Sequence, residues 1–261
     1  MKKTVWITMI QKDEAKARAV YNAISEYGLG AEGHFWKDDL DNMEWSGPVP
    51  EIVKHQNGLW LILGGAADFT TSVLQGLSLA ALSACGLKGG QLPIMILADD
   101  PEAVLEKLPP ALASAQVFSP DNQALGAKIT ARANMPLKPV ASEYRFNVHA
   151  LPKVGLWLEA GPVNGDWQGV LFGTAGATID AMGIGPAGTI PERSTLEYPL
   201  RNMTLAMGGR EVVAWAARNV VSEKDSVYVR VKGQPETFVF GPFDPEADAI
   251  DGYTLSLGPP E

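Results

Sequence analysis

The sequence is short of cysteine, of basic residues and of long apolar runs, and each shortage excludes a class of protein. Cys85 is the only cysteine among 261 residues, so no disulfide forms within the chain and a cytoplasmic location is expected. The 21 Lys and Arg are outnumbered by 30 Asp and Glu, and the net charge is −9. Because nucleic acids and anionic membranes attract basic surfaces, we expect neither as a partner. No apolar run reaches the length of a membrane span.

The first half of the chain alternates apolar runs with helix-like segments. Runs rich in β-branched and apolar residues predict strands at 5–10, 31–36, 59–63, 93–98 and 115–118. Between them lie segments with helical spacing or helix caps, and the longest, 70–84, is apolar nearly all round. Five strands alternating with helices predict a flavodoxin-like parallel sheet with strand order 2-1-3-4-5, over residues 1–138.

The remaining residues, 139–261, have the pattern of a β-rich domain. Residues 226–231 alternate apolar and polar, Lys232-Gly233-Gln234-Pro235 is typical of a turn, and 236–240 reads as a returning strand. We therefore predict a hairpin there. Further strands are expected at 145–148, 155–159, 167–172 and 200–207. Residues 211–221 suit a helix by propensity, but their neighbours favour a strand. The pattern predicts an antiparallel β-sandwich or barrel.

A glycine motif in this second half matches the G-x-G-x-x-G pattern of dinucleotide-binding loops. It runs Gly183-Ile184-Gly185-Pro186-Ala187-Gly188. Dinucleotide binding requires a strand before the glycines and a helix directly after them, so that N–H groups point at the pyrophosphate. Pro191 and Pro199 interrupt the segment after the glycines here. We therefore interpret the motif as a glycine-rich loop between strands.

The sequence predicts neither a cofactor nor a metal. His34, His55 and His149 are scattered without the spacing of metal ligands. The acidic stretch 38–44 either binds a hard cation or forms a solvated loop. FMN is not expected, because Gln11-Lys12-Asp13-Glu14 lacks the Ser, Thr and Gly of a flavodoxin phosphate loop.

Residues 57–80 carry a family resemblance. They place the small-residue loop Gly64-Gly65-Ala66-Ala67 after a buried run and before a helix. This segment resembles the strand–loop–helix core of nucleoside 2-deoxyribosyltransferase-like proteins and of TIR-like domains. Residues 28–38, which end in Trp-x-Asp, resemble the second strand of the TIR-like group. The resemblance covers about the first half of the chain and implies a flavodoxin-like fold with a nucleotide-shaped pocket.

This sequence differs from both families at the residue that carries their chemistry. In both families a glutamate early in the helix attacks or stabilises the anomeric carbon of a ribosyl N-glycoside, and Gln75 stands at that position here. An uncharged glutamine can hydrogen-bond a ribose hydroxyl, but it cannot act as a nucleophilic or charge-stabilising carboxylate.

Ligands of parallel sheets bind beyond the carboxyl ends of the strands, where the strand order reverses. The predicted order places this crevice between the first and third strands, near the free N–H groups of the helix that begins at Thr70. A tight turn and ordinary helix caps explain the same residues without a ligand. The expected ligand-binding residues are Gln11, Lys12, Trp36, Asp38, Gly64, Gly65, Asp68 and Gln75.

Two functions stay open at this point. The first is a non-catalytic binding or interaction protein, which the missing carboxylate favours. The second is a hydrolase or transferase acting on an N-glycosidic or nucleotide substrate, with Asp38 or Asp68 taking the role of the glutamate. In the β-rich half, three tryptophans either line a sugar-binding face or belong to the core. They are Trp157, Trp167 and Trp215.

Overall fold

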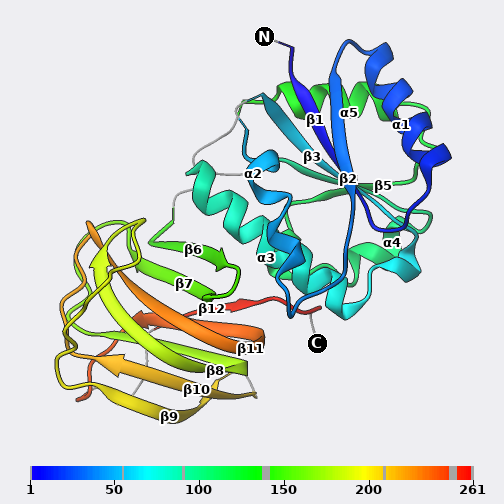
Figure 1. Ribbon diagram of the computed structural model, residues 1–261. Helices are drawn as coiled ribbons and strands as arrows, with labels where there is room; N and C mark the ends of the chain where they lie inside the picture. The colour runs from blue at the N-terminus through cyan, green and yellow to red at the C-terminus, as the bar shows by residue number, and fades with distance from the viewer. Residues whose placement is uncertain are drawn as a thin grey trace. The chain divides into compact units, whose positions relative to one another are not determined.

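A computed structural model describes residues 2–54, 56–89, 92–136, 142–207, 210–246 and 252–259. The chain forms two compact units (Figure 1). One is Met1–Val140 together with Gly258–Glu261, and the other is Ala141–Leu257. The expected boundary between residues 138 and 139 lies outside the described residues, as does His55. None of the described helices is long and apolar enough to cross a bilayer.

The first unit is a parallel α/β sandwich, which confirms the predicted fold. Its sheet has the order β2-β1-β3-β4-β5, and every neighbouring pair is parallel (Figure 1). The strands are β1 (Thr4–Met9), β2 (Gly30–Phe35), β3 (Asn57–Leu63), β4 (Ile94–Leu97) and β5 (Gln116–Phe118). The helices are α1 (Glu14–Glu26), α2 (Val49–Ile52), α3 (Thr71–Lys88), α4 (Pro101–Leu105) and α5 (Leu125–Asn134).

Side-chain alternation along the strands divides the core of this unit into two layers. Ile7 and Met9 of β1 pack with Val20 of α1 and Ile129 of α5 on one face of the sheet. On the other face, the buried indole of Trp60 donates a hydrogen bond of 2.8 Å to Thr8 Oγ1. The nearly all-apolar sequence of α3 fits the second face, where most of its residues are buried.

The second unit is a seven-stranded antiparallel sheet with the order β6-β7-β11-β8-β10-β9, and β12 pairs with β11. Two of its strands, β8 and β11, are 17 and 18 residues long. The rings of Phe146 in β6 and Phe240 in β11 lie 5.0 Å apart, so two halves of the sheet face each other as in a β-sandwich. The strands are β6 (Tyr144–Leu151), β7 (Gly155–Pro162), β8 (Val170–Pro186), β9 (Leu200–Met207), β10 (Arg210–Ala217), β11 (Asp225–Pro242) and β12 (Tyr253–Ser256).

The predicted hairpin at 226–240 is wrong, because these residues belong to the single strand β11. Gly233 pairs with Ala177 and Thr237 with Ala175, so three residues of β11 stand opposite Gly176 of β8. Gly176 and Gly233 have φ of 77° and 95°, a region that favours glycine. Pro235 lies inside this bulge, where its missing N–H removes no ladder hydrogen bond. The turn-like composition marks a bulge rather than a chain reversal.

The glycine motif also differs from the expected loop between strands. Gly183 and Gly185 lie within β8, and only Gly188 lies beyond its end. The following segment, residues 187–199, which we call the strap, packs back on these two glycines. A Cβ atom on Gly185 would lie 2.9 Å from the Pro191 ring, and one on Gly183 would lie 3.2 Å from it. The glycines therefore allow a close approach of two chain segments.

Candidate functional site

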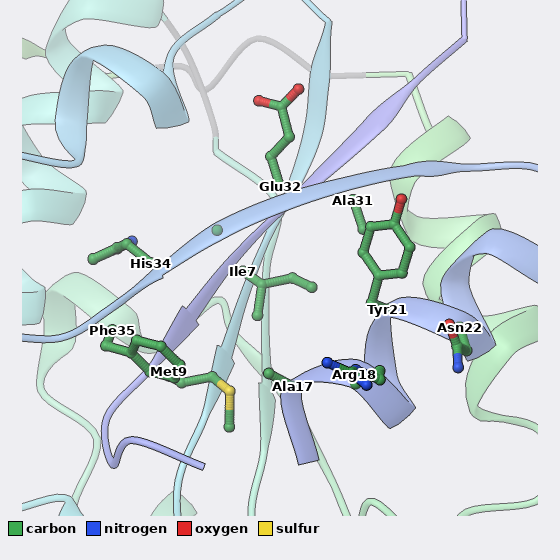
Figure 2. A pocket seen from close by; sticks show the side chains of 11 residues that line it. Ile7, Met9, Ala17, Arg18, Tyr21, Asn22, Ala31, Glu32, His34 and Phe35 are labelled. Atoms are coloured by element: carbon green, nitrogen blue, oxygen red, sulfur yellow. The ribbon is translucent and has the colours of Figure 1, made fainter. Parts of the chain in front are cut away.

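A groove of about 580 Å³ lies between α1 and the edge strand β2 of the first unit (Figure 2). Its floor contains Ile7 and Met9 of β1, Ala17 of α1, and Ala31 and Gly33 of β2. Ala31 contributes only a methyl group to this space, and Gly33 lets β2 lie close to β1, because a Cβ atom on Gly33 would lie 2.3 Å from the Ile7 carbonyl oxygen. Pockets of this size with mostly apolar walls are typical small-molecule sites.

Two aromatic rings and two polar side chains form the rim of the groove. Tyr21 stands on the α1 side and Phe35 lies at the end of β2 (Figure 2), with exposed fractions of 49% and 39%. Arg18 and Asn22, one helical turn apart on α1, complete the rim. Arg18 forms no ion pair with any described residue, so its guanidinium is available to an anionic group.

Helix α1 holds these rim residues in place. It begins at the N-cap Asp13, whose carboxylate accepts a hydrogen bond of 2.9 Å from the Lys16 N–H. Val20 and Ile24 anchor it to the sheet, being buried one turn apart in the core. A helix fixed by this stripe presents its neighbouring residues, including Arg18 and Tyr21, along the edge of the sheet.

The opposite face of β2 carries an aromatic cluster. The His34 ring is stacked on Trp6 with a centroid distance of 5.7 Å, and Trp36 lies 6.4 Å from it. Burial lowers the pKa of His34 to about 4, so the imidazole is neutral at pH 7. Within the described residues, neither ring nitrogen of His34 has a hydrogen-bond partner, and the indole N–H groups of Trp6 and Trp36 have none either.

The residues expected to bind a ligand lie at or just beyond the strand ends, apart from Gln75 within α3, and they do not line this groove. Gln11 and Lys12 are exposed after β1, whereas Trp36 is buried after β2. A Cβ atom on Gly76 of α3 would lie 2.9 Å from the Trp36 ring, so helix and indole are in close contact. Asp38 accepts a hydrogen bond of 2.8 Å from the Ser72 hydroxyl.

The other expected residues form a tightly packed turn. Gly65 N–H donates to the Asp68 carboxylate over 2.7 Å. A Cβ atom on Gly64 would lie 2.8 Å from Ile10 Cδ1 and 3.2 Å from the Phe69 ring, so side chains fill the space beside Gly64. Gln75 is only 7% exposed within α3. These residues support the turn and the helix packing, and their role in ligand binding stays a prediction.

Sequence reasoning missed Asp99 as a partner of this turn. Its carboxylate accepts a hydrogen bond of 2.6 Å from the Ala66 N–H, and this bond lowers the pKa of Asp99. The sequence could have indicated this role, because Asp99 follows the buried strand β4, whose carboxyl end lies beside that of β3. In the acidic stretch 38–44, Asp39 accepts from Asn42 and Glu44 pairs with Lys37. Among the described residues, no three His, Cys, Asp or Glu side chains gather as a metal site.

The second unit contains a buried carboxylate beneath the strap. Glu159 of β7 is 3% exposed and accepts hydrogen bonds of 2.7 Å from the Gly188 N–H and 2.9 Å from the Ser226 hydroxyl. His149 Nε2 lies 2.8 Å from its other oxygen. Burial alone would raise the pKa of Glu159, but these hydrogen bonds and the His149 charge lower it to about 2. The carboxylate is therefore ionised and holds the start of the strap.

Tyr228 provides a second anchor for the strap. Its hydroxyl donates to the Pro186 carbonyl over 2.6 Å and accepts a 2.9 Å hydrogen bond from the Thr189 N–H. Burial raises the pKa of this hydroxyl, so it remains a donor at neutral pH. Ser226 is fully buried, and its hydroxyl faces a carboxylate rather than an imidazole. The order of these groups differs from that of a nucleophilic triad, in which the histidine contacts the serine.

The tryptophans of the second unit do not form an open aromatic face. Trp167 and Trp215 are buried, with exposed fractions of 7% and 8%. Trp157 lies beneath the Arg230 guanidinium, 5.7 Å from it. Arg230 is itself paired with Asp180 over 2.7 Å. Trp167 and Trp215 thus belong to the core of the sandwich.

Comparison with known proteins gives no family for the chain. No protein-family model matches it, and no curated protein matches it. The likeness to deoxyribosyltransferase-like and TIR-like proteins therefore rests on the sequence pattern of residues 28–38, 57–80 and 92–98, and it stays a prediction.

Proposed function

We propose that the chain is a non-catalytic binding protein whose first unit holds a small, flat, largely apolar molecule with an anionic group. The observation that carries this proposal is the groove of about 580 Å³, which has an apolar floor. At its rim stands Arg18, which has no ion-pair partner among the described residues. Nucleotide-like molecules belong to this class, because they combine a flat ring with a phosphate.

Each part of the groove suits one part of such a molecule. A flat ring between Tyr21 and Phe35 gains aromatic contacts, each of about 0.5–1.5 kcal/mol. An anionic substituent at the rim reaches Arg18, whose planar guanidinium forms paired hydrogen bonds with carboxylates and phosphates. The amide of Asn22 offers both a donor and an acceptor one turn further along α1.

The groove lacks an arrangement for catalysis. Glu32 is its one carboxylate among the lining residues, and its side chain points away from Ile7 and the groove floor (Figure 2). Asp38 and Asp68, the carboxylates expected to replace the missing glutamate, bond to Ser72 and Gly65 at the strand ends instead. Binding without catalysis is the function that this set of residues supports.

A fluorescent anion tests the proposal directly. Anilinonaphthalene sulfonate has flat rings and one negative group, and we expect saturable binding to one site per chain. Ala17→Leu fills the groove floor and is expected to abolish this binding, whereas Ala131→Leu, at an exposed position of α5, is expected to leave it unchanged. Absence of saturable binding by the unaltered chain, or equal binding by Ala17→Leu, would refute the assignment.

The role of Arg18 is tested with a matched pair of probes. Arg18→Met is expected to weaken binding of the sulfonate by about 10- to 100-fold, the range of a lost charged hydrogen bond. Its affinity for the uncharged parent, anilinonaphthalene, is expected to change little. Lys16→Met, also on α1 but away from the groove lining, is the charge control. Adenosine monophosphate in the same titration tests the nucleotide-like version.

A further inference from the structure

The outer edge of β2 has unpaired backbone groups. β2 ends the strand order, so its outer side has no neighbouring strand among the described residues. Gly30 N–H donates to the Lys3 carbonyl and Trp36 N–H to the Met9 carbonyl, over 2.8 and 2.7 Å. The even-numbered residues of β2 therefore direct their backbone groups toward β1. By the alternation of a strand, the backbone groups of Ala31, Gly33 and Phe35 point outward.

The two edges of this sheet differ in how they are protected. β5, at the opposite edge, is only three residues long, and short edge strands resist pairing with other chains. β2 is six residues long, and its sequence, Gly-Ala-Glu-Gly-His-Phe, has no Lys, Arg or Pro to block an incoming strand. The β2 edge is thus a template for an added strand.

We propose that β2 pairs with β2 of a second copy of this chain in an antiparallel register centred on Gly33. In this register Gly33 faces its own counterpart, and Ala31 faces Phe35 of the second copy. These are the three residues whose backbone groups point outward, so each facing pair exchanges two N–H···O=C bonds. The two five-stranded sheets then form one continuous sheet.

The side chains on β2 complement each other in this register. Small Ala31 lies opposite the large, exposed ring of Phe35, on the face that carries α1. Glu32 lies opposite His34 at a non-hydrogen-bonded pair, where facing side chains are closest. The His34 ring nitrogens have no partner within the described chain, and the Glu32 of the second copy supplies a nearby acceptor. Because the central residue is a glycine, no two side chains face each other at the two-fold axis.

Charge also selects against a neighbouring register. Moving the two-fold axis by one residue to Glu32 would place two carboxylates directly opposite each other, which destabilises a strand pair. It would also reduce the number of outward-pointing residues that face each other. Among the registers that pair this edge with itself, the one centred on Gly33 uses all three outward residues and opposes unlike side chains.

Light scattering after gel filtration tests the association with the full chain. We expect a mass near 56 kDa, twice the chain mass of 27.9 kDa. Ala31→Pro removes an outward N–H that β1 does not use, and Glu32→Lys places a cation opposite His34. Both are expected to reduce the mass to that of one chain. Glu106→Lys, the same charge change at an exposed position after α4, is expected to keep the double mass.

Hydrogen exchange gives a second measurement on the unaltered chain. The amides of Ala31, Gly33 and Phe35 are expected to exchange more slowly as the protein concentration rises, and Glu32→Lys is expected to remove this dependence. This result decides the matter if Ala31→Pro does not fold. A single-chain mass at about 100 μM, or a double mass that Glu32→Lys leaves unchanged, would overturn the proposal. No probe is present in either measurement, so this outcome is separate from that of the groove assay.

Discussion

Replacing the buried Glu159 by Gln tests the interpretation of the second unit. Glutamine keeps the size of the side chain but removes the charge and one of the two acceptor oxygens. Gly188 and Ser226 both donate to Oε1, so the single amide oxygen can serve these two donors only as a neutral acceptor, and the NH₂ group then faces His149 Nε2 in place of Oε2. We expect the charged anchor of the strap to be weakened and the second unit to lose stability.

The pKa of Glu159 sets the size of this effect. Its fall from 4.5 to about 2 corresponds to at most about 3 kcal/mol of preferential stabilisation of the charged form in the folded state. The cluster is partly open to solvent at His149, whose side chain is 18% exposed, so we expect a loss of about 2 kcal/mol at pH 7. For a unit of this size, that is roughly 8 °C in melting temperature.

The pH dependence adds a second criterion. Because the folded pKa lies below the unfolded one, the carboxylate stabilises the fold fully above pH 4.5, and this contribution disappears as the pH falls toward 2. Calorimetry on the full chain should show Glu159→Gln melting well below the unaltered protein at pH 7 and close to it near pH 2. Glu211→Gln, at an exposed position of β10, is the control. Equal melting temperatures at pH 7 would refute the anchoring role.

Three further substitutions test other parts of the two cores. Tyr228→Phe removes both hydrogen bonds of its hydroxyl to the strap and leaves only the 3.2 Å hydrogen bond from the Thr189 N–H to the Pro186 carbonyl, so we expect a loss of about 1–2 kcal/mol, with faster hydrogen exchange at Thr189. His34 has a folded pKa of about 4, below its unfolded value of 6.5, so its neutral form gives stability that is lost as the pH falls from 6.5 to 4. In the unaltered chain, the free energy of unfolding measured in urea should therefore fall by about 2 kcal/mol between pH 6.5 and pH 4 because of His34, and His34→Phe should remove this part of the pH dependence. Trp60→Phe removes the hydrogen bond to Thr8 and opens a cavity, which should reduce the free energy of unfolding by about 1–3 kcal/mol.

The first unit was readable from sequence because each strand buried on both faces is a continuous apolar run. Residues 59–63 and 93–98 show this pattern, and the nearly all-apolar helix between them is expected in a buried layer. The groove could not be predicted in the same way. Its lining includes the small residues Ala31 and Gly33, and no sequence pattern states how far a helix lies from an edge strand.

The second unit was readable as a class but not in its connections. Glu159 and His149 meet because β6 and β7 pair in a register that sets Glu159 opposite Asn147, diagonal to His149. That register depends on the turn between the strands and on their packing, so the ten-residue separation of the two side chains in sequence carries no such signal. The buried carboxylate was therefore invisible until the strands were paired.

Glycine and proline explain the two errors in that unit by one physical cause. Glycine lacks the side chain that restricts the backbone dihedral angles, and proline lacks the backbone N–H that strand pairing uses. In a sequence, both residues therefore indicate a turn. Here the breaks are taken up within long strands. Gly176 and Gly233 bend paired strands at a bulge, while Gly183 and Gly185 clear the surface of β8 for the strap. β8 and β11 can stay continuous because they pair with each other and are of similar length, and such a partner strand overrides a local turn signal. β11 carries Tyr228, and it pairs with β7, which carries Glu159. Both side chains bond to the strap, so the glycines and the buried anchors are parts of one arrangement.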